Sequence, residues 1–575
     1  MRFGTFAASC KPLKISLASA LLHSRYLLAG LAGLMLAAAF PNFGLAGLGW
    51  VGPGLLLGSA LGKTPSESFR IGYVGGLSYY LAALYWLLYI PYQWHGIPLG
   101  PAAGWLALSG YLALYPAAWV WLLSSHSKGF EGAESQKNLA WLRMQSEGSG
   151  LLANTWSRRA LWAICGAASW VALEMIVARL FSGFPWLILG ISQFRLLPLI
   201  QFSSFTGVYG VSFLLVWVSL SLLSAALMLL RQPASRLIWV TEIFVPVLVV
   251  ALLFQFGFRQ IRQAAGPART LKVTFVQPSI PQTLIWDPTK DDERFQHLLR
   301  LSEDALTNRT DLLLWPEAAI PKLLRYDKAT FEAVTNLARK HKVWLIVGAD
   351  DAEPRGDQAK TRDFFNSSFL INPQGELEQG YKKRNLVIFG EYIPLERWLP
   401  FMKFFTPIPG GFTSGDRAVQ FELTDLNVKA SPLICFEDVF PQLSRECTQA
   451  DTDFLVNLTN DGWFGESAEP WQHAASGVFR AVENRVPLLR CTNTGLTCWI
   501  DAEGRLRQIC RDNKGSVYGI GVMTAEIPLL ALGEKRPSTF YNAHADWFGW
   551  SCVGMTGLLV LWKFRNLAGG RRLDR

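Results

Sequence analysis

Charged residues are scarce in this chain of 575 residues. Asp, Glu, Lys and Arg make up 17% of it, whereas soluble proteins average about 25%. Half of the residues are hydrophobic, and they are concentrated in residues 1–258 and 543–575. Most Asp and Glu lie in 270–535. A long chain with this distribution is not one ordinary soluble domain. We therefore predict a membrane part with a water-facing domain inserted before the last membrane segment.

Cysteine and histidine are also few. The eight cysteines form no CxxC pair, and the seven histidines are dispersed. No metal-ligand spacing results, so the sequence predicts neither a metal site nor a cofactor. A disulfide between Cys491 and Cys498 is one alternative if their domain lies outside the cytoplasm. Two buried free thiols are the other.

The chain has no basic stripe with interleaved aromatic residues, although its net charge is +10. Lys and Arg lie mainly at the ends of apolar segments, as the rules of membrane orientation require. This pattern argues against nucleic acid as a partner and in favour of a lipid bilayer.

Apolar segments that approach the length of a membrane span recur through the chain. A helix needs roughly 20 mostly apolar residues to cross a bilayer. The first two candidates are short or rich in Gly, so we expect them to be tilted or distorted. A basic start followed by Ala37-Ala38-Ala39 also fits a cleaved signal peptide, but further apolar segments follow at once, which favours a retained helix. The eight candidates are 26–40, 43–61, 71–90, 101–123, 160–180, 206–230, 237–257 and 546–564.

The charges of the loops predict how these spans are oriented. Lys and Arg occur in the loops 62–70, 124–159 and 231–236 and at both termini, but not in 91–100. Both termini are then cytoplasmic and the water-facing domain lies outside, although Arg259, Arg262 and Arg269 depart from this rule. The predicted domains are 1–258 with about seven spans, 259–545 outside the cytoplasm, and 546–575 with the final span and a basic tail.

Glu174 lies among apolar residues of a predicted span. An acid inside a membrane is costly, so we expect it to serve function or helix pairing. The nearby stretch Gly183-Phe184-Pro185-Trp186 is typical of an interfacial or re-entrant turn with an aromatic anchor.

Strands and helices are both predicted in the water-facing domain, and several strands end in Glu, Cys or Asn. This pattern favours a layered α/β fold whose chemistry lies at strand ends. The predicted strands are 271–277, 311–315, 343–348, 366–371, 433–436, 454–458, 488–492 and 497–501, and the predicted helices are 291–307, 328–341 and 472–484.

Cys435 is the strongest candidate nucleophile. It follows a short apolar run and precedes two acids, so it lies where a buried strand meets a turn. Glu317 follows another apolar strand, and Lys383 lies in a basic loop. A carboxylate can take the thiol proton, while an ammonium favours the thiolate. Lys383 and the backbone N–H of Phe436 can then stabilise a tetrahedral oxyanion.

The order of these stretches resembles the carbon–nitrogen hydrolase (nitrilase) superfamily, with its Glu–Lys–Cys triad. With membrane spans on both sides, nearly the whole chain resembles the apolipoprotein N-acyltransferase family. The stretches that carry the resemblance are Gly183-Phe184-Pro185-Trp186, Gln277-Pro278, Ile280-Pro281-Gln282, Trp286-Asp287, Trp315-Pro316-Glu317, Phe389-Gly390-Glu391-Tyr392, Ile434-Cys435-Phe436-Glu437 and Asn460-Asp461-Gly462-Trp463-Phe464-Gly465.

The resemblance implies an αββα sandwich and a role for each matching residue. Cys435 is the expected nucleophile, Glu317 the general base and Lys383 the oxyanion partner; Lys382 competes for that role, but the spacing of Lys383 to Glu391 favours Lys383. The resemblance also implies that Glu391 and Glu437 are supporting acids; the alternative interpretation is that they form structural ion pairs. Trp286, Phe436 and Trp463 are implied at the substrate entrance, and core packing is the alternative for Trp463.

Three positions depart from the family pattern. Phe436 stands where Tyr is usual, which removes a hydroxyl contact. Ile388 stands where Pro is common, and Asn385 where His is frequent. These changes concern details of the loops and leave the triad intact.

The implied activity is the transfer of an acyl chain from a phospholipid to the α-amino group of a diacylglyceryl-cysteine of an apolipoprotein, through a thioester on Cys435. The implied location is the bacterial inner membrane with the catalytic domain on the periplasmic side, and a monomer is the default expectation. Two alternatives stay open. One is a membrane-tethered amidase or nitrilase, which would need one helix rather than eight. The other is a transporter with a periplasmic binding domain, against which stands the lack of repeated halves.

Overall fold

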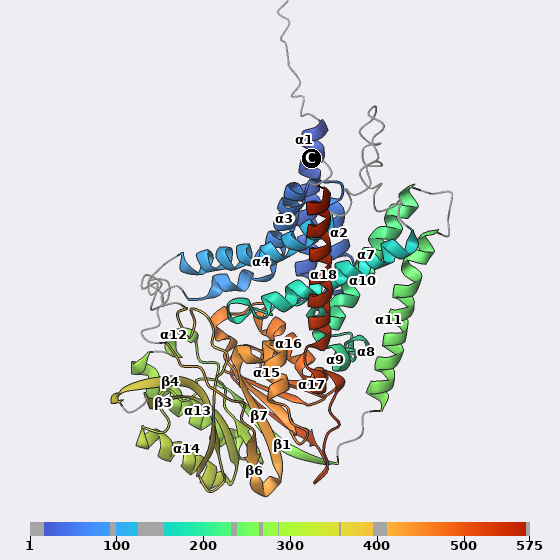
Figure 1. Cartoon of the computed structure of the whole chain (residues 1–575). Coiled ribbons are helices and arrows are strands. Elements are labelled where there is room, and N and C mark those ends of the chain that lie inside the picture. The colour runs from blue at the N-terminus through green and yellow to red at the C-terminus, as the bar shows by residue number, and fades with distance from the viewer. Residues whose placement is uncertain are drawn as a thin grey trace, which may run out of the picture.

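The computed structural model describes a helical part and a β-rich catalytic domain that lie one above the other (Figure 1). We use the name catalytic domain for the two sheets and the helices packed on them. The described residues are 17–91, 99–124, 155–231, 238–263, 268–285, 287–355, 358–394 and 411–570.

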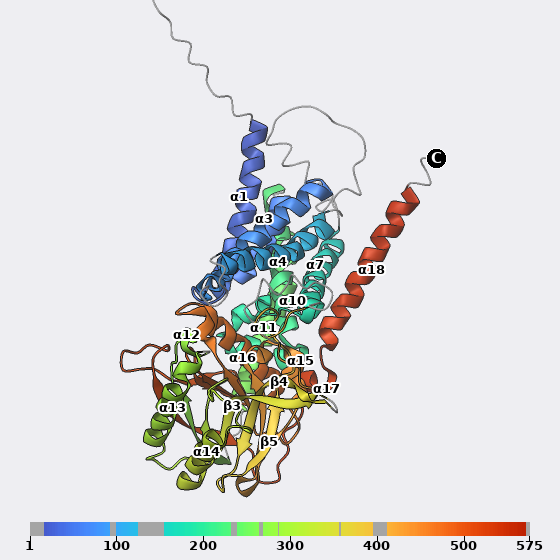
Figure 2. The same cartoon turned by 90° about the vertical axis from the view of Figure 1, so that its left-hand side faces the viewer.

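The helical part consists mainly of long apolar helices. Figure 2 shows α18 rising from the catalytic domain at one side of the other helices. Its long and medium helices are α1 (Leu17–Ala38), α2 (Gly52–Ala60), α3 (Pro65–Ala83), α4 (Gly100–Ser124), α7 (Trp156–Val177), α10 (Val208–Arg231), α11 (Ile238–Arg262) and α18 (Trp547–Gly570).

Four helices in the described ranges are long and apolar enough to cross a membrane, namely α4, α7, α10 and α11. The expected total of about eight spans is therefore not confirmed. The prediction of a span over 43–61 is wrong, because this segment contains a 3-10 turn over Ala46–Trp50 and then the nine-residue helix α2. Gly52-Pro53 lies at the start of α2. It explains the break between the 3-10 turn and α2, since proline has no N–H to continue a preceding helix.

Small residues let the helices approach closely. A Cβ atom at Gly33 of α1 would lie 2.1 Å from the carbonyl oxygen of Gly75 in α3. No side chain fits in that space, so glycine at position 33 is required by packing, as in other closely packed apolar helices.

The described part of the catalytic domain contains two six-stranded mixed sheets, with the strand orders β12-β1-β2-β3-β4-β5 and β11-β10-β9-β8-β7-β6. The pairs β1–β2, β2–β3, β7–β8 and β8–β9 are parallel. The strands are β1 (Arg269–Gln277), β2 (Leu312–Leu314), β3 (Trp344–Arg355), β4 (Gln358–Ile371), β5 (Leu377–Lys382), β6 (Phe421–Leu423), β7 (Val428–Ile434), β8 (Phe454–Thr459), β9 (Leu488–Thr492), β10 (Cys498–Ile500), β11 (Leu506–Ile509) and β12 (Gly521–Leu529).

The two sheets pack face to face, and helices cover their outer faces. Apolar side chains of both sheets, such as Phe275 and Val456, form one buried cluster between them. Helices α13 (Asp291–Ala305) and α14 (Lys328–His341) pack on the first sheet. Helices α15 (Pro441–Glu446) and α16 (Glu469–Asn484) pack on the second. The result is an αββα sandwich, in which α16 lies between the second sheet and the helical part.

The predicted strands and helices of this domain are confirmed with shifts at their ends, whereas β5, β6, β11 and β12 were not predicted. Cys491 and Cys498 are both buried and free, so the disulfide alternative is wrong and the alternative of two free thiols is confirmed. Each of the two cysteines lies in a buried strand, with its thiol away from solvent.

Candidate active site

Cys435 lies where β7 ends and a 3-10 turn, Cys435–Val439, begins. Its φ is 51°, a left-handed conformation that is rare outside glycine. Such strain persists only where surrounding contacts hold it. Here the side-chain amide of Asn457 in β8 donates to the carbonyl oxygen of Cys435 at 2.9 Å. The turn lifts the thiol away from the strand while the backbone stays anchored.

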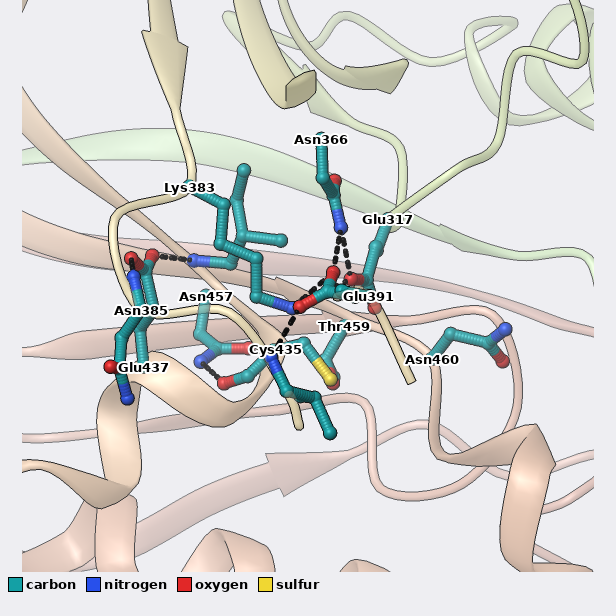
Figure 3. A network of polar contacts seen from close by, with 12 residues as sticks. Glu317, Asn366, Lys383, Asn385, Glu391, Cys435, Glu437, Asn457, Thr459 and Asn460 are labelled. Carbon is teal, nitrogen blue, oxygen red and sulfur yellow. Dashed lines mark hydrogen bonds and ion pairs between the residues drawn. The ribbon is translucent and has the colours of Figure 1, made fainter. Parts of the chain in front are cut away.

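Glu317, Lys383 and Glu391 converge beside this thiol (Figure 3). The ammonium of Lys383 lies 2.9 Å from Oε1 of Glu391 and 3.3 Å from Oε1 of Glu317. Nδ2 of Asn366, in β4, donates to the same two carboxylates at 2.8 Å. All four side chains are buried. One ammonium and one amide thus hold two carboxylates close together.

A tight turn presents Glu391. Its Oε2 accepts from the backbone N–H of Val387 at 2.8 Å, and its own N–H donates to the carbonyl of Val387 at 2.8 Å. Phe389, within the turn, has a φ of 60°. The turn therefore fixes the carboxylate that anchors Lys383.

Glu437 ties the loop that carries Lys383 to the strand that carries Cys435. Its Oε1 accepts from the backbone N–H of Arg384 at 2.7 Å, and its Oε2 accepts from that of Ile434 at 2.7 Å. The hydroxyl of Tyr381 donates to both carboxylate oxygens at 2.8–2.9 Å. Glu437 thus contacts the residues that follow Lys383 and precede Cys435.

Burial and charge set the protonation of this cluster. Burial raises the pKa of the Cys435 thiol well above its ordinary value, Glu317 raises it further, and Lys383 opposes both. Burial also raises the pKa of Glu317 against the opposing effect of Lys383. The pKa of Lys383 is raised, because Glu391 and then Glu317 outweigh the effect of burial. The resting site thus holds a neutral thiol beside a charged ammonium.

Lys382, the competing lysine, lies elsewhere. Its ammonium pairs with Glu353 and lies 4.0 Å from the ring centre of Phe365. Successive strand residues point to opposite faces of a sheet. Lys382, the last residue of β5, therefore faces away from the site while Lys383 faces into it.

Two of the three residues expected at the substrate entrance, Phe436 and Trp463, lie in the described part of the chain. Phe436 is half-buried, and its ring lies 5.9 Å from those of Trp186 and Phe184 in the helical part. Trp463 is half-buried in the turn Asp461–Phe464. Trp286 lies outside the described residues. Phe436 therefore joins the thiol to the helical part, and the roles of all three stay predictions.

An apolar pocket opens in the helical part near Phe436. Phe184 and Pro185 line it, together with Trp119 and Leu112. Glu174 also borders it; its Oε1 accepts from Nε1 of Trp170 and from the N–H of Leu189, both at 2.8 Å. Glu174 thus fastens α7 to the segment after residues 183–186, which fits the expected role in pairing helical segments.

Sequence reasoning missed several residues of this site. Asn366, Tyr381, Asn457 and His473 make hydrogen bonds to the proposed catalytic or supporting residues. Asn366 and Asn457 each lie in a predicted strand, and a polar residue in an otherwise apolar strand was the available signal. Tyr381 carried no comparable signal.

Comparisons with known sequences match both parts of the chain. Residues 272–536 match the family model "Carbon-nitrogen hydrolase", and residues 32–221 match "Apolipoprotein N-acyltransferase N-terminal domain". A Geobacter metallireducens protein named apolipoprotein N-acyltransferase is 35% identical over 94% of this chain and 95% of its own length. One from Methylococcus capsulatus is 32% identical over 95% and 98%. The crystal structure of Saccharomyces cerevisiae Nit3, of the nitrilase superfamily, aligns with a TM-score of 0.35 and 18% identity over 46% of this chain and 93% of that one.

Proposed function

We propose that this chain, which belongs to the apolipoprotein N-acyltransferase family, transfers an acyl chain from a membrane phospholipid to the N-terminal S-diacylglyceryl cysteine of apolipoproteins. This is the last step of lipoprotein maturation. The observation that carries the proposal is the match over 94% of the chain to a relative with that name. The contacts among Cys435, Glu317 and Lys383 support a covalent mechanism.

In the first half-reaction, Glu317 takes the proton of the Cys435 thiol, and the thiolate attacks the ester carbonyl of the phospholipid. Lys383 and the N–H of Phe436 stabilise the oxyanion. The new C–S bond replaces the C–O bond to glycerol. The departing alkoxide receives the proton from Glu317 and leaves as lysophospholipid.

In the second half-reaction, the neutral α-amino group of the diacylglyceryl-cysteine attacks the thioester carbonyl. Glu317 takes the proton that the amine loses. A C–N bond forms, the C–S bond breaks, and the proton returns to the sulfur of Cys435. The amide product leaves, and the resting thiol is regenerated.

The helical part gives this chemistry a physical setting. Moving a 16-carbon acyl chain into water costs about 0.8 kcal/mol per CH₂, or about 12 kcal/mol in all. The ring of Phe184 in the helical part lies 5.9 Å from that of Phe436, the residue after Cys435. An acyl chain that stays among apolar side chains can present its ester to the thiol without meeting that barrier.

The same proposal includes a location. The four helices that are long and apolar enough to cross a membrane support a membrane location, and the loop charges favour a periplasmic catalytic domain in the bacterial inner membrane. Phospholipid and apolipoprotein are then both available at one membrane surface. We propose that the monomer is sufficient, since Glu317, Lys383 and Cys435 all come from one chain.

The test is the mass of a reporter lipoprotein in cells depleted of their own acyltransferase. We compare the unmutated chain with Cys435→Ala and with Cys165→Ala, a matched control that removes another half-buried thiol. We expect the reporter to gain an N-linked acyl group with the unmutated chain and the control only. Acylation of the reporter by the Cys435→Ala variant would show that Cys435 is not the nucleophile.

The alternative function is a membrane-tethered amidase, which shares the same three side chains. It predicts that no variant acylates the reporter although all are folded in the membrane. Purified protein given labelled phospholipid alone separates the two further. The acyltransferase then carries label on Cys435, whereas the amidase does not.

A further inference from the structure

Two consecutive residues of α16, Gln472 and His473, contact different parts of the molecule. Neighbouring residues on a helix point about 100° apart, so adjacent side chains can reach different parts of the molecule. Gln472 contacts the helical part, and His473 contacts the backbone of Cys435. Both side chains are almost fully buried, at 2% and 1% exposure.

Gln472 makes every hydrogen bond that its amide can form. Its oxygen accepts from Nε1 of Trp86 at 3.1 Å and from Nε1 of Trp186 at 2.9 Å. Its Nε2 donates to the carbonyls of Pro41 at 2.7 Å and Ala83 at 3.2 Å. An amide offers two lone pairs and two N–H groups, and here all four are used. One side chain thereby fastens several separate segments of the helical part to α16.

His473 holds the carbonyl of the proposed nucleophile. Its Nε2 lies 3.2 Å from the carbonyl oxygen of Cys435 and 2.8 Å from Oδ1 of Asp438, and its Nδ1 lies 3.0 Å from Oδ1 of Asp461. Both ring nitrogens face oxygen acceptors, so both must carry a proton. Asp438 and Asp461 keep the pKa of His473 raised to about 10, against the lowering effects of burial and of Arg490.

The cluster around His473 is an ion-pair network. Glu469 lies 3.7 Å from Nδ1. Nη1 of Arg490 donates to Asp438 at 2.6 Å, and Nη2 lies 3.6 Å from Asp461. The carboxylates are thus paired with an imidazolium and a guanidinium, and the imidazolium is held in place from both of its nitrogens.

The carbonyl of Cys435 and the N–H of Phe436 belong to one planar peptide group and point in opposite directions. Holding the carbonyl therefore aims the N–H. Asn457 holds the same oxygen from another side at 2.9 Å. Because the φ of Cys435 is left-handed, this peptide needs external contacts to keep its orientation.

We propose that Gln472 and His473 are positioning residues that couple the lipid-holding helical part to the oxyanion site. The inference rests on the proposed function. His473 aims the N–H of Phe436 at the carbonyl of the acyl donor, and Gln472 fixes the helix that carries His473 against the segments that hold the lipid. Trp186 completes the link, because its ring lies 5.3 Å from that of His473 and 5.9 Å from that of Phe436.

The test measures two reactions of Cys435 with different needs in full-length protein in phospholipid nanodiscs. Acylation by an ester needs the oxyanion site, whereas alkylation by iodoacetamide does not. For His473→Gln we expect acylation by a soluble p-nitrophenyl butyrate ester and by labelled phospholipid to fall about 100-fold, the usual effect of one oxyanion donor. Alkylation should change less than about threefold, since the thiol keeps its neighbours Glu317 and Lys383.

For Gln472→Glu we expect a different split. Acylation by phospholipid should fall more than about tenfold, while acylation by the soluble ester stays within about threefold, because only the alignment with the bound lipid is lost. Gln201→Glu is the matched control. Gln201 also bridges the helical part to the catalytic domain, donating to the carbonyl of Glu503 at 2.9 Å, but it does not contact the segments that meet Gln472, and it should leave both esters unaffected.

The proposal for His473 is overturned if its variant lowers alkylation and acylation in parallel, or lowers neither. Should His473→Gln fail to fold, Asn457→Leu removes the other donor to the same carbonyl and must give the same split. The proposal for Gln472 is overturned if its variant affects both esters equally or if Gln201→Glu reproduces its effect. All of these assays omit the apolipoprotein, so a wrong acceptor in the proposed function leaves them unchanged.

Discussion

Two buried charged clusters lie on opposite sides of Cys435, and they differ in their ratio of cations to acids. The thiol-side cluster, Glu317, Lys383 and Glu391, has one cation for two carboxylates. The backbone-side cluster has two cations, His473 and Arg490, for the carboxylates of Asp438 and Asp461. We expect its third acid, Glu469, to be neutral, because burial and then Asp461 raise its pKa well above the ordinary value.

The pKa values of Glu317 and Asp438 differ in the direction that this ratio predicts. Burial alone raises the pKa of a carboxyl group. In Glu317, burial and the neighbouring Glu391 outweigh Lys383, and the pKa is raised. In Asp438, His473 and then Arg490 outweigh burial, and the pKa is lowered. A carboxyl group with a raised pKa is ready to take a proton, whereas one with a lowered pKa serves as a fixed anion. The same chemical group, a carboxyl, thus suits proton transfer on one side of the cysteine and anchoring on the other.

The largest effect should come from removing the proton acceptor. Glu317→Gln keeps the size and most hydrogen bonds of the side chain but cannot take the thiol proton. We expect kcat for reporter acylation to fall about 10²- to 10⁴-fold, the usual contribution of a general base, while Lys383 keeps its closer partner Glu391 at 2.9 Å. Glu353→Gln, at an acid near the surface that pairs with Lys382, is the control and should keep full activity. If Glu317→Gln kept full activity, Glu317 would not be the proton acceptor, and the proposed difference in role between the two clusters would be wrong.

A substitution in the backbone-side cluster should lower the stability of the folded protein. Asp438→Asn leaves Arg490 and His473 facing a neutral amide, and breaking a buried ion pair costs about 3–5 kcal/mol. We expect a clearly lower thermal unfolding midpoint in detergent. A midpoint equal to that of the unmutated chain would show that Asp438 is not a structural anion.

The cation of the thiol-side cluster can be removed separately. Lys383 opposes the effects that raise the pKa of Cys435. In Lys383→Met the thiolate should be rarer, and iodoacetamide should alkylate Cys435 at least about tenfold more slowly at pH 8. Lys382→Met, at the neighbouring lysine, serves as control. Alkylation that is as fast in Lys383→Met as in the unmutated chain would contradict the electrostatic role of this ammonium.

The smallest effect concerns pH. The pKa of His473 is raised to about 10 in the folded protein, above its ordinary value of about 6.5. Its contribution to stability is therefore complete below the ordinary value and is lost as pH rises through the folded value. The loss is at most about 1.4 kcal/mol per pH unit. The unfolding midpoint should fall between pH 8 and pH 10, and less steeply in His473→Gln. Equal slopes would mean that His473 is neutral in the folded state.

Much of the site could be predicted because its residues end apolar strands. Cys435 follows β7 of one sheet and Glu317 follows β2 of the other, and the face-to-face packing of the two sheets brings these strand ends together. Gln472 and His473 could not be found in this way. They lie in a predicted helix, and their partners lie 386 and 38 residues away in the chain, so no local pattern reveals them.

The predicted membrane spans show a second limit of prediction from sequence. Hydropathy counts apolar residues, and the segment 43–61 is apolar throughout, yet Gly52-Pro53 divides it into short helices. The strand β12 was not predicted, although its buried and exposed residues alternate, and its partner β1 lies about half a chain away. Trp286 and most of the loop 124–159 lie outside the described residues.

The pairing of β1 with β12 has a consequence for how such a protein can arise and be made. Arg269 lies opposite Leu529, so the catalytic domain begins and ends at one edge of one sheet. A unit whose two ends meet can be inserted into a membrane protein as a whole, since the flanking helices need not move apart to receive it. During synthesis, the ribosome completes both sheets before it makes α18. The last helix is therefore made only after a nearly finished domain has preceded it.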